Sequence, residues 1–158
     1  MKTERYYDYM ELAFREAEEA YKKDEVPVGA VVVFEDKIIG RGHNQVEALH
    51  DATAHAEIIA LSAAYNHFDD WRLENCILVS TLEPCAMCAG AAVLSRIKTI
   101  VYGAKDEKFG ACDSIFHIPQ ETKTNHQIEV VSGIMQDDVS ALMKHFFSQI
   151  RKKKGRIN

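Results

Sequence analysis

Cys85 and Cys88 lie three positions apart in the stretch STLEPCAMCAGAA (residues 80–92), directly after Pro84. Proline suits the first position of a helix, because the N–H that it lacks would have no partner there. We therefore expect both thiols in the first turn of a helix, on one face of it. The positive end of the helix dipole favours their thiolate forms, which bind soft dications such as zinc.

A histidine and a glutamate earlier in the chain could complete such a site. The stretch TAHAEIIA (53–60) places His55 at the expected start of another helix, with Glu57 two residues later. In α/β proteins, residues that begin successive helices lie at one edge of the sheet, outside the strand ends. We therefore expect His55, Cys85 and Cys88 to converge on one zinc ion.

Three protein ligands are typical of a catalytic zinc site, because the fourth position is left for water. Zinc lowers the pKa of bound water from about 15.7 toward about 7, and Glu57 would act beside it as a proton shuttle. A structural site would need a fourth strong ligand, such as Cys76 or Cys112. A redox pair fits less well, because Pro84 stands where an aromatic residue is usual. Catalytic zinc is the favoured interpretation, with Cys76 and Cys112 as free thiols.

The hydrophobic pattern predicts the elements that position these residues. Thr53 is a good N-cap for the helix that carries Glu57. Helical periodicity and β-branched runs account for the rest. Helices are expected at 4–23, 54–66, 84–94 and 136–153, strands at 27–34, 37–42, 76–81, 98–104 and 128–134, and polar loops at 43–52 and 105–126.

This order predicts a single α/β domain over residues 1–158, with a mixed five-stranded sheet between helices on both faces. Apolar residues at 47% and charged residues at 27% are ordinary globular values. No apolar stretch approaches the roughly 18 residues that span a bilayer, and no export signal is evident. We therefore expect a cytoplasmic protein without membrane contact, in which the four cysteines serve in metal binding, in catalysis or as free thiols rather than in disulfides.

The charge of the chain is unevenly distributed. The basic tail at 151–158, RKKKGRIN, carries five basic residues and no acid, so the net charge of −5 becomes −10 for the preceding 150 residues. Such a tail could contact nucleic-acid phosphates, although a solvated helix end has the same composition.

H-x-E at 55–57 and P-C-x-x-C at 84–88 together form the signature of zinc deaminases. The chain resembles the bacterial tRNA-specific adenosine deaminases of the cytidine deaminase-like superfamily over nearly its whole length. Guanine, cytosine, deoxycytidylate and riboflavin-pathway deaminases share the zinc motif, so the stretch at 101–111 and the C-terminal helix favour the tRNA enzymes. The matching stretches are EVPVGAVVV (25–33), HN (43–44), TAHAE (53–57), WRLENCILVSTLEPCAMCAGA (71–91), SRI (95–97), VYGAKDEKFGA (101–111), NH (125–126) and FF followed by Arg151.

The resemblance implies a three-layer αβα cytidine deaminase-like fold, a homodimer and one Zn²⁺ per subunit. It also implies hydrolytic conversion of adenosine to inosine at the wobble position (A34) of a tRNA anticodon stem-loop. Glu57 would be the catalytic proton shuttle. The implied metal ligands are His55, Cys85 and Cys88, and the implied substrate-binding residues are Asn44, Ala56, Asp106, Phe146, Phe147 and Arg151.

Several of these residues also have structural explanations. Asn44 suits a turn, and Asp106 could be a solvated loop acid. Phe146 and Phe147 are neighbours in a helix and point about 100° apart, so we expect one in the core and one facing RNA. Two other functions share the zinc motif: a deaminase of free nucleobases or nucleotides, and a zinc module without enzymatic activity.

Overall fold

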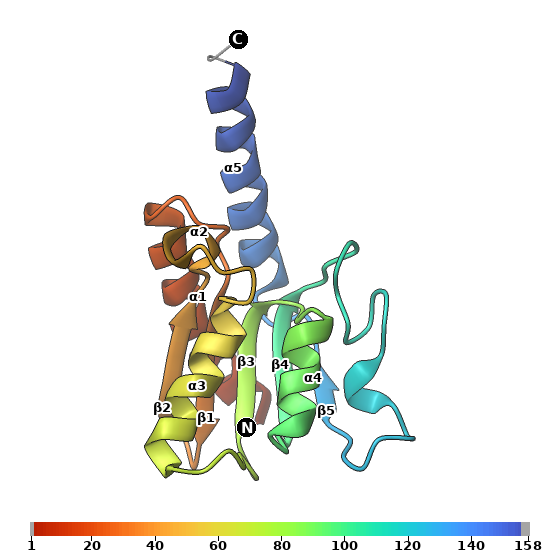
Figure 1. Ribbon diagram of the computed structural model, residues 1–158. Helices are drawn as coiled ribbons and strands as arrows, with labels where there is room; N and C mark the ends of the chain where they lie inside the picture. The colour runs from red at the N-terminus through yellow and green to blue at the C-terminus, as the bar shows by residue number, and fades with distance from the viewer. Residues whose placement is uncertain (1, 156–158) are drawn as a thin grey trace.

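A five-stranded sheet forms the centre of the computed structural model, which describes residues 2–155 (Figure 1). The strand order is β2-β1-β3-β4-β5. β1 pairs antiparallel with β2 and β3, whereas β3, β4 and β5 run parallel, so the expected mixed sheet is confirmed. The strands are β1 (Gly29–Phe34), β2 (Lys37–His43), β3 (Ile77–Leu82), β4 (Thr99–Ala104) and β5 (Glu129–Val131).

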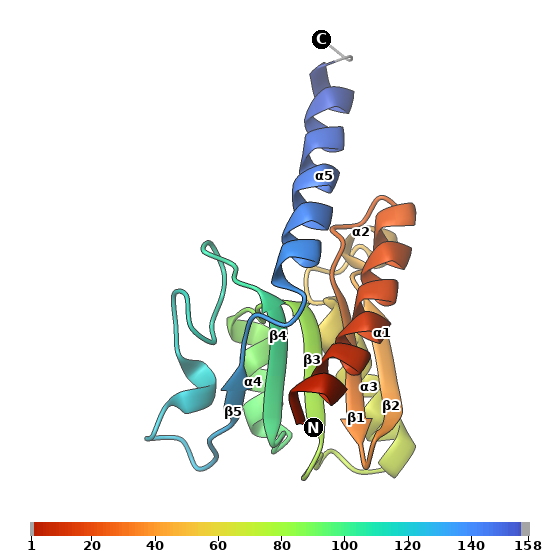
Figure 2. The same cartoon turned by 180° about the vertical axis from the view of Figure 1, so that it is seen from behind.

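Helices cover both faces of this sheet and make three layers, as expected. α3 and α4 lie on one face (Figure 1), and α1 covers the other, where α5 also begins (Figure 2). α5 then projects well beyond the sheet edge. The helices are α1 (Lys2–Lys22), α2 (Val46–Leu49), α3 (Ala56–Phe68), α4 (Ala86–Leu94) and α5 (Gln136–Gly155), with a short 3₁₀ turn, η1, at Ile118–Gln120.

The central strands bury both of their faces. On β3, Leu78 packs in the cluster beneath α3 and α4, while the next residue, Val79, packs in the cluster beneath α1. Ile100 and Val101 divide in the same way on β4. Strands buried on both sides read as continuous apolar runs rather than alternating ones, which is why these segments were recognisable in the sequence.

Two glycines on β2 let α3 lie directly on the sheet. A Cβ atom on Gly42 would lie 2.4 Å from the carbonyl oxygen of Ala56, and one on Gly40 would lie 2.2 Å from that of Ala60. Ala56, Ala60 and Ala64 are fully buried on the facing side of α3. The start of α3, and Glu57 with it, is thereby held at a fixed distance from β2.

Two expectations about the helix starts were wrong. Thr53 is not the N-cap of α3, because its N–H and hydroxyl both donate to Asp51 Oδ1, at 2.8 and 2.7 Å, in a local turn. His55 takes the N-cap position instead. Pro84 does not open α4 either: its carbonyl oxygen accepts the N–H of Ala111, and the chain stays extended to Cys85, which is the N-cap of α4.

The loops contain more structure than the sequence indicated. The expected loop at 43–52 includes α2, and the one at 105–126 includes η1. β5 ends at Val131 rather than at 134, because Gly133 has a positive φ of 87° that breaks the strand. Residues 151–155 of the basic tail continue α5 and are exposed, while Arg156 lies outside the described residues. Within residues 2–155, no helix is both long and apolar enough to cross a membrane.

Candidate metal centre and adjoining cavity

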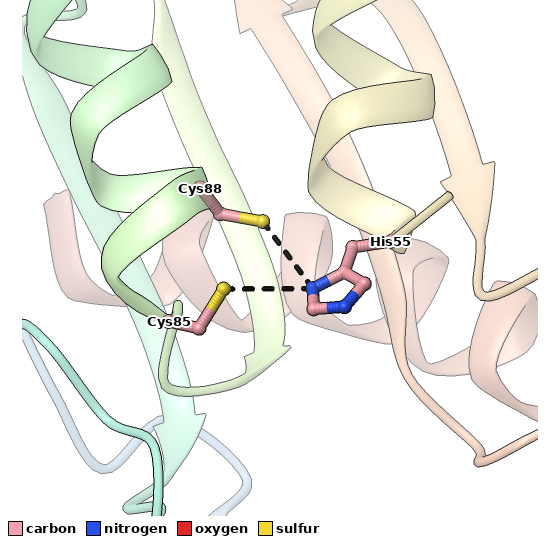
Figure 3. A group of neighbouring side chains, drawn as sticks. All are labelled: His55, Cys85 and Cys88. Carbon is pink, nitrogen blue, oxygen red and sulfur yellow. Dashed lines mark hydrogen bonds between the residues drawn. The ribbon is translucent and has the colours of Figure 1, made fainter. Parts of the chain in front are cut away.

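His55, Cys85 and Cys88 meet at one end of the sheet. The imidazole at the start of α3 faces the two sulfurs at the start of α4 (Figure 3). Nδ1 of His55 lies 3.5 Å from Sγ of Cys85 and 3.6 Å from Sγ of Cys88. Tetrahedral zinc, with bonds of about 2.1 Å to nitrogen and about 2.3 Å to sulfur, places such atoms about 3.6 Å apart. The three side chains therefore fit a zinc ion as they stand.

Neither Cys76 nor Cys112 joins this group of potential ligands. Cys76 and Cys112 are buried free thiols, as expected, and burial raises the pKa of Cys76 to about 11. Among residues 2–155, His55, Cys85 and Cys88 form the one cluster of three or more potential ligands from His, Cys, Asp and Glu. This donor set is that of an open, catalytic type of site rather than a closed structural one.

The two thiols of the cluster differ in acidity. Hydrogen bonding with Cys88 and with His55 lowers the pKa of Cys85 to about 4, despite its partial burial. The same bond to Cys85, together with burial, raises the pKa of Cys88. The hydrogen bond with Cys85 also raises the pKa of His55. The cluster thus stabilises a thiolate, the form in which cysteine binds metal.

Glu57 lies beside this cluster, in the first turn of α3. Its side chain is buried, and burial raises the pKa of its carboxyl group. A carboxyl group whose pKa is shifted toward neutrality can both accept and return a proton during a reaction. The structure therefore places an acid–base group, and not a fourth sulfur, next to the predicted ligands.

A cavity of about 440 Å³ opens next to the metal cluster, within the size range of small-molecule sites. His55, Cys85 and Glu57 line it, whereas Cys88 is buried behind them. Apolar side chains and several acids make up most of the remaining wall. The other lining residues are Asp24, Glu25, Val26, Val28, Asn44, Val46, Glu47, Ala56, Leu82, Glu83, Asp106, Phe109, Phe146, Phe147 and Ile150.

Asn44 and Asp106 line the cavity, and the side chain of each also hydrogen-bonds to backbone groups. Asn44 donates from Nδ2 to the carbonyl oxygen of Val26 and accepts the N–H of Val46 at Oδ1, both at 3.2 Å. An amide side chain has a second donor and further acceptor capacity, which Asn44 can offer to a ligand. Asp106 accepts the N–H groups of Lys108 and Phe109 at Oδ1, which leaves Oδ2.

The two adjacent phenylalanines of α5 divide as expected. Phe146 is buried at 4% exposure and packs edge-on against Tyr21 of α1, while Phe147 is 40% exposed. Both line the cavity, as does Ile150. Arg151, by contrast, is exposed on α5 and is not part of the cavity wall. The structure thus brings together every predicted substrate-binding residue except Arg151, which lies just outside.

Sequence reasoning missed two buried acids that shape the cavity. Glu25 accepts the N–H groups of Glu47 and Ala48, at 2.9 and 2.8 Å, and so caps the start of α2. In the sequence, Glu25 was indicated only as an acid next to an apolar run, in EVPVGAVVV. Such a signal is weak, because its partners lie more than 20 positions away.

Glu83 is the second of these acids, and it organises the loop that follows β4. Its carboxylate accepts the backbone N–H groups of Asp106, Cys112, Asp113 and Ser114, and the hydroxyl of Ser114. Burial alone would raise the pKa of Glu83, but these hydrogen bonds outweigh it and lower the pKa. The third missed residue, Phe109, lies on the loop that Glu83 holds; its signal was a single aromatic residue in a polar stretch.

The chain matches the MafB19-like deaminase family over residues 5–151. It is 45% identical to the tRNA-specific adenosine deaminase of Bacillus subtilis (strain 168) over 146 residues, which cover 92% of this chain and 91% of that protein. It is 43% identical to the tRNA-specific adenosine deaminase of Aquifex aeolicus (strain VF5) over 143 residues, 90% of this chain and 94% of that one.

Solved structures show the same likeness. One, from a study of A-to-I editing by tRNA:A34 deaminases at the wobble position of transfer RNA, superposes with a TM-score of 0.82 at 39% identity, covering 85% of this chain and 98% of that one. The guanine deaminase from Nitrosomonas europaea superposes with a TM-score of 0.77 at 27% identity, covering 89% and 83%.

Proposed function

The chain belongs to the MafB19-like deaminase family and to the tRNA-specific adenosine deaminases, and we propose on this basis how its residues act on tRNA. It is a hydrolase that converts adenosine to inosine at the wobble position of a tRNA anticodon. The observation that carries this function is the identity to tRNA-specific adenosine deaminases over about nine tenths of the chain. The fit of His55, Cys85 and Cys88 to zinc supports the chemistry.

These three residues would hold one zinc ion per subunit. When bound, zinc acts as a Lewis acid that makes water nucleophilic near neutral pH. We assign Glu57 the proton transfers: it takes one proton from the attacking water and delivers it to N1 of adenine. It then takes the second proton from the oxygen newly bonded to C6 and delivers it to the amino group, which leaves C6 as ammonia while that oxygen becomes the carbonyl of inosine. Its burial and raised pKa suit a group that must carry a proton between these atoms.

The target base must leave its stack to enter the cavity. Ala56 is the first residue of α3, so its N–H has no partner within the helix and can donate to the base. The remaining donor and acceptor capacity of Asn44 would hold another edge of the base. Asp106 Oδ2 would contact a sugar hydroxyl, and Phe146 and Phe147 would border the groove for the RNA loop.

RNA phosphates would lie outside this cavity. Three of the acids in its wall, Asp24, Glu47 and Asp106, disfavour phosphates there. The end of α5 carries exposed basic side chains, of which Lys153 pairs with Asp24 at 3.4 Å. We assign Arg151 and its basic neighbours on α5 to the phosphates of the anticodon stem-loop. We also propose that the enzyme is a homodimer in the cytoplasm, where tRNA is decoded, which light scattering and fractionation would test.

The decisive experiment is to incubate the zinc-loaded protein with a tRNA that carries adenosine at the wobble position. The tRNA is then digested to nucleosides, and inosine is quantified against the same tRNA with guanosine at that position. We expect inosine only from the first substrate. The structural likeness to a guanine deaminase makes free guanine the informative competitor, because ammonia release from guanine without RNA would instead indicate a nucleobase deaminase.

A further inference from the structure

Phe109 is an exposed aromatic residue at the edge of the cavity. Its side chain is 68% exposed, although large apolar side chains usually avoid water. Of the eight exposed large hydrophobic residues within residues 2–155, only Phe109 and Phe147 line the cavity. Exposed apolar surface beside a ligand cleft marks a contact site, and here the two rings come from different elements.

The backbone around Phe109 is held in place. Asp106 Oδ1 accepts the N–H groups of Lys108 and Phe109, at 3.0 and 3.2 Å, and the carbonyl oxygen of Asp106 accepts the N–H of Gly110 at 2.8 Å. The N–H of Asp106 is in turn bound by Glu83 at 3.1 Å. A side chain presented by such a loop loses little conformational entropy on binding.

Gly110 lets this loop approach Glu83. A Cβ atom on Gly110 would lie 2.4 Å from Cδ of Glu83 and 2.5 Å from the carbonyl oxygen of Asp106. The loop rises at the end of the sheet where α3 and α4 begin (Figure 1). The position of Phe109 is therefore tied to the residues that adjoin the metal ligands.

The chemistry of the cavity wall indicates what Phe109 would contact. No lysine or arginine lines the cavity in the described part of the chain, and the lining acid nearest to Phe109 in sequence is Asp106, so a phosphate is disfavoured there. A flat aromatic ring without a polar group suits a nucleobase face, and such stacking tolerates any base. When the target adenosine leaves its stack, each neighbouring base loses a stacking partner.

We propose that Phe109 stacks on the base of a nucleotide adjacent to the target adenosine and replaces the partner that has left. This inference rests on the proposed function, since it assumes an RNA loop at the cavity. It assigns a substrate contact to a residue outside the zinc motif, and it predicts that one neighbouring base contributes to catalytic efficiency.

The test compares Phe109 variants on a synthetic anticodon stem-loop. We expect Phe109→Ala to lower kcat/KM by about tenfold, because base–aromatic stacking accounts for effects of this size. Phe109→Tyr should retain the wild-type value, and Phe109→Leu, which keeps volume but loses the aromatic face, should behave like alanine. Phe116→Ala is the matched control, because Phe116 is 52% exposed on the same loop but does not line the cavity.

Stem-loops with an abasic site before or after the target adenosine identify the partner base. On one of them, wild-type and Phe109→Ala should have equal kcat/KM, because the stacking partner is gone. An undiminished effect of Phe109→Ala on both abasic substrates, or full activity of Phe109→Leu, would overturn the proposal. Zinc content and thermal unfolding identify any misfolded variant. If Phe109→Ala is misfolded, the comparison of Phe109→Tyr with Phe109→Leu tests the proposal instead. Absence of inosine with the wild-type protein would instead contradict the proposed function.

Discussion

At the scale of residues, the proposed site separates metal binding from proton transfer. His55, Cys85 and Cys88 would supply the ligand atoms, whereas the buried carboxyl group of Glu57 lies beside them. The sequence predicted this division because ligand and acid–base residues have fixed spacings within two short motifs. It could not predict Glu83, because an acid that binds the N–H groups of residues 106–114 has no local pattern.

Glu57→Gln should therefore remove activity without removing zinc. The amide keeps the size of the side chain but cannot accept and return a proton, so we expect a loss of about 10²- to 10⁴-fold or more in kcat. Inosine formation and metal analysis of the same preparation measure both properties. Cys85→Ala is the contrasting variant, since it should lose both zinc and activity. A Glu57→Gln protein with normal activity would mean that another group transfers the proton.

The loop after β4 likewise depends on a single side chain, because the carboxylate of Glu83 accepts several of its backbone N–H groups. Glu83→Gln should destabilise the protein by about 2 kcal/mol, because hydrogen bonds to a charged acceptor are worth about 1.5–3 kcal/mol and the NH₂ group that replaces one carboxylate oxygen cannot accept from the loop. Denaturant unfolding measures the loss. Hydrogen exchange should then be faster at residues 112–114 than in the wild type, and unchanged exchange there would contradict the assignment.

At the scale of elements, the sheet and most helices could be predicted, but their ends could not. Apolar runs such as 98–104 identify strands that are buried on both faces. α2 was missed because its four residues depend on Glu25, more than 20 positions earlier, to bind their N–H groups. Thr53 was misassigned because Asp51 offered its side chain a nearer partner than the helix did.

The close contact between β2 and α3 provides a prediction for Gly42, which can be compared with a glycine that has open space around it. Gly42→Ala should destabilise the protein by about 1–3 kcal/mol, because the new methyl group overlaps the backbone of α3 and nothing flexible can yield. Gly90→Ala is its control: Gly90 lies within α4 with open space around it, so alanine should stabilise the helix by up to about 1 kcal/mol. Thermal unfolding compares the two. Equal effects would show that α3 can move away from the sheet.

At the scale of the whole molecule, the distribution of charge makes the proposed RNA binding depend on one helix. The chain carries a net charge of −5, and the cavity wall includes acids but no lysine or arginine among the described residues. The exposed end of α5 concentrates basic residues beyond the cavity. The sequence showed that the basic residues cluster at the C-terminal end. Their position relative to the cavity could not be predicted, because it depends on the direction in which α5 runs.

Reversing the charge of Arg151 and Lys152 together should raise KM for tRNA with little change in kcat, since phosphate contacts contribute to binding rather than to the reacting atoms. KM of the wild type should rise with salt concentration, and the double variant should show a shallower dependence. Lys37→Glu, at the hairpin turn at the other end of the sheet, is the control and should leave KM unchanged. Parallel salt curves for wild type and double variant would exclude these residues from phosphate binding.

α5 first borders the cavity with Phe146, Phe147 and Ile150 and then continues as a straight rod past it (Figure 2). The cavity wall, to which we assign base binding, and the cationic end are consequently parts of one helix, with a separation set by a rise of about 1.5 Å per residue. Inserting a single residue after Ile150 would turn the cations by about 100° about the helix axis. Such an insertion would leave every contacting side chain intact. It would nevertheless change the course that the RNA backbone must take to reach both the cavity and the cations.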